Sequence, residues 1–138
     1  MSYQSGIPTA VEIPSIDGDY GSIGVVEGVS LLPFGVNRMY FIHGVPEKAE
    51  RGSHAHRKLS QLILCVSGSL KLSLTDGLTH FDFNLNRPTI GVLIPPGFWR
   101  TLNDFSKGAV CVVLASDVYQ ETDYIRDYEE FLEWRARR

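Results

Sequence analysis

Short apolar segments separated by turn residues recur along this sequence at intervals of about 8–12 residues. Glycine, proline or aspartate marks the breaks, as in Ser67-Gly-Ser69, Asp76-Gly77 and Pro95-Pro-Gly97. Within one segment, Leu70-Lys-Leu-Ser-Leu74 alternates apolar and polar residues, as a half-buried strand does. The pattern predicts an all-β sandwich or barrel, with strands near 23–26, 39–42, 61–66, 70–74, 80–85, 89–94 and 110–115.

A helix is predicted only near the C-terminal end, from Tyr124 to Trp134, with Thr122 or Asp123 as its N-cap. The apolar residues of this segment that share one helical face are Tyr124, Tyr128, Phe131 and Leu132. Acidic residues come early in the segment and arginines come last, which suits the helix dipole. We therefore expect a surface helix that packs this face on the β-structure.

Length and charge narrow the class of protein. The 138 residues have the size of one domain, which we expect to span residues 1–138. A formal net charge of −3 argues against general nucleic-acid binding, which usually needs a basic domain. No apolar run reaches the roughly 20 residues of a membrane span, and the first residues lack a signal-peptide pattern. Cys65 and Cys111 each lie in an apolar run, so we expect reduced core residues in a cytoplasmic protein.

The segment Arg51-Gly-Ser-His-Ala-His56 carries the clearest functional signal. Residues two apart on a strand face the same side, so His54 and His56 would present both imidazoles together. Gly52 permits a sharp turn or a close backbone approach just before them. Because imidazole titrates near physiological pH, the pair is a candidate for acid–base chemistry.

A histidine pair that opens an all-β domain is similar to the metal site of the cupin barrels. Cupins add a glutamate a few residues later and a third histidine after a Pro-x-Gly motif. In this chain Gln61 takes the glutamate position, and Arg100 takes the histidine position. A guanidinium repels a divalent cation and does not give up its proton to bind one. The residues therefore predict that no metal is bound.

Motifs along most of the chain make it similar to the nucleotide-sugar 3,4-ketoisomerases, the WxcM-like sugar isomerases. The resemblance covers roughly residues 10–132 and is specific in the combination of two motifs. These are Arg51-Gly-Ser-His-Ala-His56 and Asp123-Tyr-Ile-Arg-Asp-Tyr128. Further matching segments are 38–42, 64–69, 95–99 and 113–116.

This resemblance implies a cupin-like jelly-roll barrel, a double-stranded β-helix, that uses no metal and no organic cofactor. It also implies a homodimer, and the open edges of a jelly roll favour exchange of N-terminal strands between the two subunits. The substrate would be dTDP-4-keto-6-deoxyglucose, whose ketone moves from C4 to C3 through an enediol or enediolate. Such products lead to the amino sugars of bacterial surface glycans.

The resemblance also assigns catalytic roles. His54 or His56 would be the base that removes the C3 proton, with the other as a second acid or an orienting partner. The sequence does not decide between the two. Tyr40 would donate to a sugar oxygen or relay a proton, and its alternative is a core or dimer tyrosine.

Four further residues are candidates for substrate binding. Arg51 and Arg38 would hold the diphosphate, unless they form surface ion pairs. Gln61 would bond a histidine or the ligand. Trp99 would stack on a base or a sugar, although a core position suits an isolated tryptophan equally well.

Two departures from the family pattern concern the product. Tyr20 stands where arginine is common in the family, and Arg100 stands where histidine is common. In a product with the gluco configuration at C4, the C3 and C4 hydrogens lie on opposite ring faces, so a second proton donor is needed. Tyr20 would be that donor, with the charge of Arg100 favouring release of its proton. We therefore expect the gluco product rather than the galacto product.

Three other functions remain as alternatives. A metal-dependent cupin enzyme would lose its activity with a chelator. A sugar-nucleotide 3,5-epimerase would exchange the proton at C5 as well as the proton at C3. A non-catalytic domain would bind the nucleotide sugar and leave it unchanged.

Overall fold

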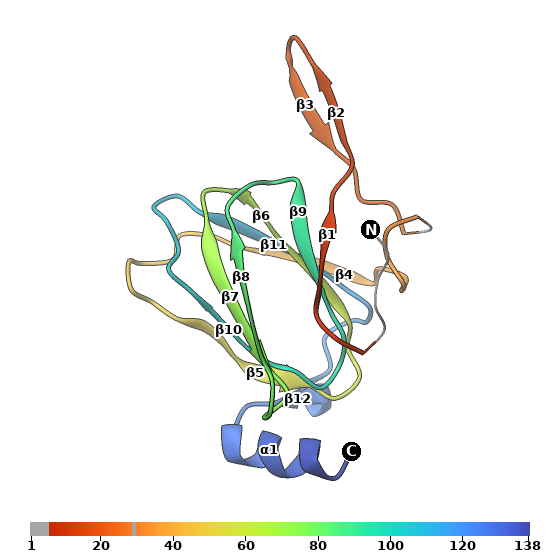
Figure 1. The fold of residues 1–138 in the computed structure, drawn as a ribbon, viewed down its shortest axis with the longest axis vertical. Coiled ribbons are helices and arrows are strands. Elements are labelled where there is room, and N and C mark those ends of the chain that lie inside the picture. Colours follow the sequence, from red (N-terminus) through yellow and green to blue (C-terminus); the bar gives the residue numbers. More distant parts are fainter. Residues whose placement is uncertain (1–5, 29) are drawn as a thin grey trace.

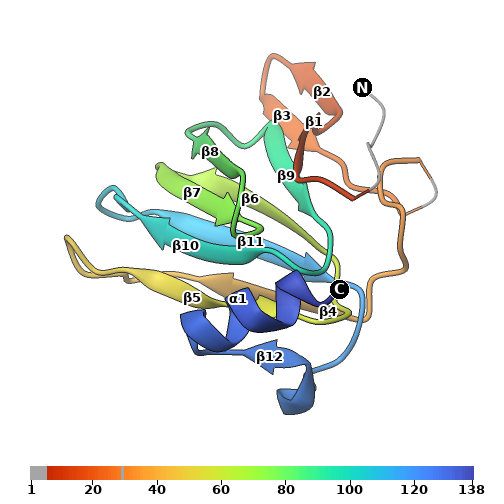
Figure 2. The ribbon, with the colours of Figure 1, turned by 60° about the horizontal axis from the view of Figure 1, so that its bottom comes forward.

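Two five-stranded antiparallel sheets face each other and form a barrel (Figures 1 and 2). The computed structural model describes residues 6–28 and 30–138. The first sheet has the order β1 (Thr9–Glu12), β9 (Ile90–Ile94), β6 (Gln61–Ser67), β11 (Val110–Ala115) and β4 (Arg38–Ile42). The second has the order β12 (Tyr124–Ile125), β5 (Arg51–His56), β10 (Trp99–Asn103), β7 (Leu70–Thr75) and β8 (His80–Leu85). The predicted all-β class is confirmed.

Side chains from both sheets meet in one apolar core between them. Leu70, Leu72 and Leu74 point into this core from β7, in the predicted alternation. Cys65 of β6 and Cys111 of β11 are buried there without a disulfide, as expected for reduced core residues. The burial of these alternating side chains fixes the register of the strands that form the site.

The predicted strands agree with the observed strands to within two residues at each end. The apolar-run pattern did not predict the other five strands, which are β1, β2 (Ser15–Gly18), β5, β10 and β12. Of these, only β5 was expected to be a strand, from the spacing of His54 and His56. Strand β10 shows the physical reason, because its sequence Trp-Arg-Thr-Leu-Asn is mostly polar. Its inward positions include Arg100, which lines a cavity rather than the apolar core.

The C-terminal helix starts later than predicted. Helix α1 spans Tyr128–Ala136, and its N-cap is Asp127, whose side chain accepts a hydrogen bond of 3.0 Å from the Glu130 amide. The expected caps, Thr122 and Asp123, lie instead in a short 3₁₀ turn, Glu121–Asp123, and the first residues expected in the helix form strand β12. Strand β12 pairs with β5, so the β5 edge satisfies its backbone groups in place of helical hydrogen bonds.

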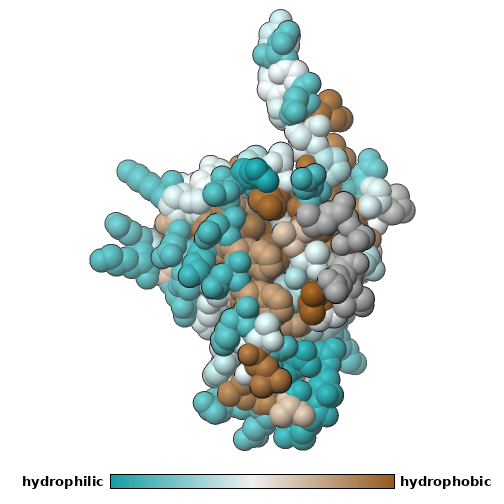
Figure 3. All heavy atoms as spheres, in the orientation of Figure 1, coloured by the Kyte–Doolittle hydropathy of each residue, from teal (hydrophilic) through white to brown (hydrophobic). Residues whose placement is uncertain are grey.

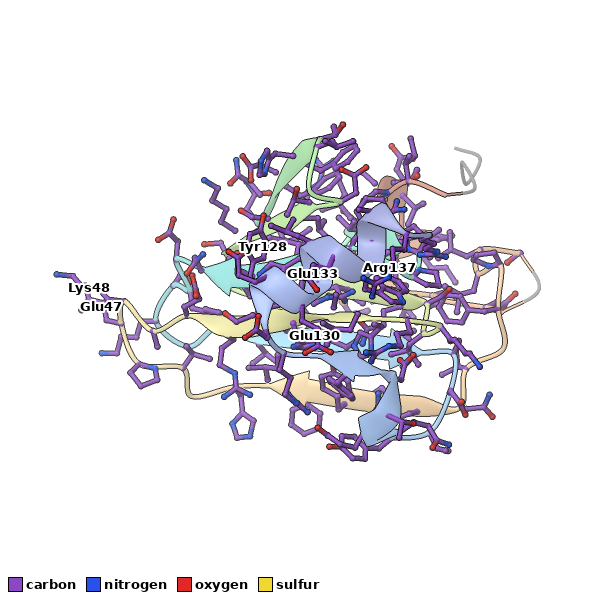
Figure 4. The ribbon with its side chains drawn as sticks, turned by 90° about the horizontal axis from the view of Figure 1, so that it is seen from below. Glu47, Lys48, Tyr128, Glu130, Glu133 and Arg137 are labelled. Atoms are coloured by element: carbon purple, nitrogen blue, oxygen red, sulfur yellow. The ribbon has the colours of Figure 1, made fainter. Side chains whose placement is uncertain are left out.

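Helix α1 packs across the end of the barrel that is lowest in Figure 1, and Figure 2 shows it beside β5 and β12. Phe131 is buried against Ala55 and Ile125 of these strands. The outer side of the helix is charged, with Glu130, Glu133 and Arg137 exposed (Figure 4). The prediction of a surface helix on the barrel is confirmed. In the described part of the chain, no helix has the length and apolar character needed to cross a membrane.

The hairpin of β2 and β3 (Gly21–Gly24) projects away from the barrel (Figure 1). Ile16 and Ile23 pair across it, and each keeps 62% of its surface exposed. Tyr20, at the turn, is fully exposed. Apolar atoms are visible on this projection in Figure 3. Since isolated hairpins are marginally stable, we expect another surface to cover it.

Candidate active site

A cavity of about 530 Å³ opens inside the barrel, a size suited to a small-molecule ligand. Inward-facing side chains from both sheets line it, because every second residue of a strand points to the same side. Its polar lining comprises Arg38, Tyr40, Glu50, Arg51, His54, Gln61, Arg100, Tyr124 and Arg126. Six of the nine residues predicted for the site are therefore gathered in one cavity: Arg38, Tyr40, Arg51, His54, Gln61 and Arg100.

The backbone before His54 fixes the orientation of its ring. Gly52 has a φ of +88°, and a Cβ there would lie 3.0 Å from the carbonyl oxygen of Arg100, so the close approach requires glycine. His54 Nδ1 lies 3.1 Å from the carbonyl oxygen of Gly52. Because a carbonyl oxygen only accepts, Nδ1 carries the hydrogen, and Nε2 keeps a lone pair that can take a proton.

The surroundings of His54 keep its ring neutral. Burial lowers its pKa to about 4, and the positive charge of Arg100 acts in the same direction. At neutral pH the imidazole is therefore unprotonated at Nε2. It is available as a base in a cavity that it lines.

His56 lies behind His54 and does not line the cavity. Its side chain has no exposed surface, and its Nδ1 donates a 2.8 Å hydrogen bond to Asp123 Oδ2. The other carboxylate oxygen of Asp123 accepts a 2.7 Å hydrogen bond from the Lys58 amide. Burial lowers the pKa of His56, so this ring is also neutral. Among the described residues its buried Nε2 has no hydrogen-bond partner.

A buried polar chain links three predicted site residues. Arg100, only 2% exposed, donates from Nη1 to Gln61 Oε1 and from Nη2 to the Phe98 carbonyl at 3.1 Å. Gln61 Nε2 donates to the Tyr40 hydroxyl at 3.2 Å. Burial lowers the pKa of Arg100 to about 10 and raises the pKa of Tyr40. Arg100 is thus a cation and Tyr40 a protonated phenol at neutral pH.

The contact between Gln61 and Arg100 also bears on whether the metal of related cupin barrels could bind here. Gln61 and Arg100 hold the positions expected for two cupin ligands, and here they hydrogen-bond each other. A buried guanidinium at that point repels a divalent cation and offers it no lone pair. These residues do not fit a cupin metal centre.

Arginines surround the cavity. Arg38 and Arg51 come from β4 and β5, and Arg126 follows β12. The side chain of Arg126 lies over the Tyr124 ring at 4.3 Å, and two hydrogen bonds of 3.0 Å to Glu121 hold it. The buried Nε of Arg38 has no hydrogen-bond partner in the described part of the chain. This arrangement suits an anionic ligand with several oxygen atoms.

Trp99 and Tyr20 do not join this cavity. Trp99 neighbours Arg100 on β10 and so points to the opposite face, where its ring lies 5.2 Å from that of Tyr128. This position agrees with the alternative of a packing residue, and the ligand-stacking role expected for Trp99 stays an untested prediction. Tyr20 sits on the projecting hairpin, whereas Arg100 is buried in the barrel. Within one chain, the charge of Arg100 therefore acts on the two histidines rather than on Tyr20.

Sequence reasoning missed three residues of the site, namely Asp123, Tyr124 and Arg126. The Tyr124 ring lies 4.4 Å from that of His56 and 5.1 Å from that of His54. The error followed from placing this segment in the helix, since Tyr124 was then assigned to a packing face. The motif Asp123-Tyr-Ile-Arg126 was itself the available signal, because its three polar side chains reach the site from strand β12 and from the residues on either side of it.

A family model described as "FdtA: WxcM-like, C-terminal" matches residues 8–136 of this chain. Among curated proteins, the chain is similar to the TDP-4-oxo-6-deoxy-alpha-D-glucose-3,4-oxoisomerase of Aneurinibacillus thermoaerophilus. The two are 39% identical over 117 residues, which make up 85% of this chain and 84% of that protein.

Solved structures show the same likeness. A histidine-to-asparagine mutant of the 3,4-ketoisomerase QdtA from Thermoanaerobacterium thermosaccharolyticum, in complex with TDP-4-keto-6-deoxyglucose, is 35% identical. Its TM-score is 0.93, with 98% of each chain covered. The WlaRB TDP-quinovose 3,4-ketoisomerase from Campylobacter jejuni is 38% identical with a TM-score of 0.87, covering 91% of this chain and 97% of that one. These similarities confirm the predicted cupin-like jelly-roll fold.

Proposed function

This chain belongs to the FdtA, WxcM-like family and is an isomerase, and on that premise we propose that it is a dTDP-4-keto-6-deoxyglucose 3,4-ketoisomerase. One observation carries the proposal. The basic Nε2 of His54 and the hydroxyl of Tyr40 belong to one arginine-rimmed cavity. A base and a hydrogen-bond donor beside the same ligand are what a ketone shift needs. The named relatives act on or bind TDP-linked keto sugars, which supports this substrate class.

The first step is removal of the proton at C3, which the neighbouring C4 ketone acidifies. His54 Nε2 takes this proton, the C3–H electron pair forms the C3–C4 double bond, and the C4 oxygen becomes an enediolate oxygen. Tyr40 donates a hydrogen bond to the developing negative charge. His54 is the base in this proposal because it lines the cavity, whereas His56 is enclosed behind it.

The second step returns a proton to C4. The C3 hydroxyl gives its proton to the C4 oxygen, the C3–C4 double-bond electron pair takes up the new proton at C4, and C3 becomes the ketone. C3 is thus oxidised as C4 is reduced, and no outside electron acceptor is required. Delivery from the face opposite to His54 gives the gluco configuration. Quinovose is 6-deoxyglucose, and the likeness to a TDP-quinovose ketoisomerase supports the gluco product.

Substrate binding uses the arginines of the cavity. We infer that Arg38, Arg51 and Arg126 bind the diphosphate, since guanidinium groups pair with phosphate oxygens through two parallel hydrogen bonds. The partnerless Nε of Arg38 supports this role. Gln61 is turned to Arg100 and Tyr40, so its contribution is to the arrangement of the site.

We also infer a homodimer in which the β2–β3 hairpin lies against a second copy. The exposed pair Ile16 and Ile23 supports this, as do the exposed Met39 and Phe41 on the outer face of β4. Tyr20 would then reach the site of the partner subunit as the second proton donor. This arrangement accounts for the separation of Tyr20 from Arg100 within one chain.

The test is to incubate the purified protein with dTDP-4-keto-6-deoxyglucose in D₂O, with and without EDTA, and to follow proton NMR. We expect a 3-keto sugar with deuterium at C4, formed equally in both samples. A parallel reaction in H₂O keeps the C4 proton, whose coupling to the C5 proton is large for the gluco product and small for the galacto product. Absence of turnover would indicate the alternative of a non-catalytic domain that binds the nucleotide sugar. Loss of turnover with EDTA would indicate a metal enzyme, and exchange at C5 would indicate an epimerase.

A further inference from the structure

Arg100 donates a hydrogen bond to Gln61, and Gln61 donates one to Tyr40. This donor-to-acceptor direction bears on the reaction. We propose that Gln61 is a positioning residue that makes the Tyr40 hydroxyl a hydrogen-bond donor to the substrate, with Arg100 fixing the orientation of the Gln61 amide. This inference rests on the proposed function and assigns Gln61 a role through Tyr40 rather than on the substrate itself.

The direction starts at Arg100. A guanidinium carries only donors, so the atom of Gln61 that faces it must be an acceptor. That atom is the carbonyl oxygen Oε1, and the second donor group of Arg100 is held by the Phe98 carbonyl. A flipped amide would set its NH₂ group against the guanidinium, and neither side chain has as much as 3% of its surface exposed to water that could separate the two donors.

The orientation of the Gln61 amide decides which of its atoms faces Tyr40. With Oε1 committed to Arg100, the group left to face Tyr40 is the NH₂, which donates to the phenol oxygen at 3.2 Å. The phenol oxygen therefore accepts on that side, and its hydrogen points elsewhere. Among the described residues, no acceptor takes the hydrogen of the Tyr40 hydroxyl, and Tyr40 lines the cavity shared with His54.

This geometry suits the enediolate. A phenol that already accepts from an amide is a stronger donor, because hydrogen bonds in a chain polarise one another. Burial raises the pKa of Tyr40, so the phenol keeps its hydrogen at neutral pH. Arg100, at the start of these hydrogen bonds, lines the same cavity, and its positive charge favours negative charge there.

The variant Gln61→Glu tests the direction with little change in shape. A glutamate accepts from Arg100 and also from Tyr40, so the phenol hydrogen would turn away from the substrate. We expect kcat to fall about 100-fold, the usual effect of losing one oxyanion donor, with KM close to the native value. A native kcat in a folded Gln61→Glu protein would overturn the proposal.

A double-mutant cycle separates this role from a structural one. In a Tyr40→Phe background there is no hydroxyl to orient, so adding Gln61→Glu should change kcat by less than about twofold. A second loss as large as that in the native background would mean that Gln61 acts independently of Tyr40, which would overturn the proposal.

The hydrogen-bond state of the Tyr40 hydroxyl can be measured in the protein without substrate, so this test does not depend on the proposed function. The Raman Fermi doublet of tyrosine differs between a phenol oxygen that accepts a hydrogen bond and one that only donates. The difference spectrum between the native protein and Tyr40→Phe isolates Tyr40 from the other five tyrosines. We expect the acceptor signature in the substrate-free protein, and a donor-only signature would refute the assigned direction. If the NMR experiment shows no isomerisation while the acceptor signature is present, the proposed function fails and the assigned direction stands.

Discussion

The imidazole of His56 stands edge-on to that of His54, with ring centroids 4.9 Å apart and planes at 87°. His54 faces the cavity, and His56 is held behind it by the carboxylate of Asp123. The spacing of two residues on strand β5 places the two rings side by side, and strand β12 brings Asp123 and Tyr124 against them. The pair therefore divides into a ring that lines the cavity and a buried ring behind it.

The substitution Asp123→Asn should reverse the tautomer of His56. The Lys58 amide can only donate, so the asparagine oxygen would face it, and the asparagine NH₂ would face His56 Nδ1. Nδ1 must then accept, and the hydrogen moves to Nε2. We expect ¹⁵N NMR to show this change and kcat to fall about 10–100-fold, as for other residues that orient a functional histidine.

Asp127→Asn is the matched control for this experiment. Asp127 caps helix α1, and asparagine caps helices equally well, so we expect native activity and stability. If Asp123→Asn keeps the native tautomer and the native kcat, the carboxylate does not position His56.

The substitution His54→Asn should abolish proton transfer while leaving the fold intact. Asparagine has a similar size and cannot accept a proton, so we expect kcat to fall about 10²–10⁴-fold. The measurement is the rate of deuterium incorporation in D₂O. His80→Asn is the control, because His80 lies exposed at the start of β8. A His54→Asn protein with more than about a tenth of native activity would transfer the base role to another group.

The site shows how far local sequence patterns extend. The His54–His56 pair follows from strand periodicity, and the same rule puts Arg100 and Trp99 on opposite faces of β10. The alternation of faces could be applied to Trp99 only if residues 99–103 were recognised as a strand. Their mostly polar sequence does not indicate a strand. The contacts of Asp123 and Tyr124 depend on β12 adding to the edge of β5, a pairing between distant segments with no local signal. The position of Tyr20 depends on the hairpin standing apart from the barrel.

The lowered pKa of His54 predicts how activity and stability respond to acid. The protonated ring is not a base, so kcat/KM should fall as pH drops through about 4, well below the usual histidine range. The unfolded chain takes up this proton near pH 6.5, before the folded chain does. The contribution of the neutral His54 ring to the free energy of unfolding is therefore fully present above about pH 6.5 and is lost as pH falls towards 4. Thermal unfolding at several pH values checks this, and His54→Asn should weaken the dependence. Activity that falls already near pH 6.5 would contradict it.

The substitution Trp99→Leu should reduce stability without affecting the substrate. Trp99 packs against Tyr128 and Phe131, which join helix α1 to the barrel. The side chain is half-buried, so we expect the free energy of unfolding to fall by about 2 kcal/mol. Denaturant unfolding and KM are the two measurements. An unchanged stability with a raised KM would return Trp99 to the binding site.

The proposed dimer makes a prediction about which chain provides each catalytic group. Coexpressing His54→Asn and Tyr20→Phe chains with different tags allows the mixed dimer to be purified. If Tyr20 acts on the partner's site, one site of this dimer holds both His54 and Tyr20, and the other holds neither. The mixed dimer should then form the gluco product at about half the native rate, while each parental dimer forms little. If both groups act within one chain, each site of the mixed dimer lacks one of them and the product is not restored. Full gluco activity of the Tyr20→Phe parent would show instead that the second proton comes from another donor.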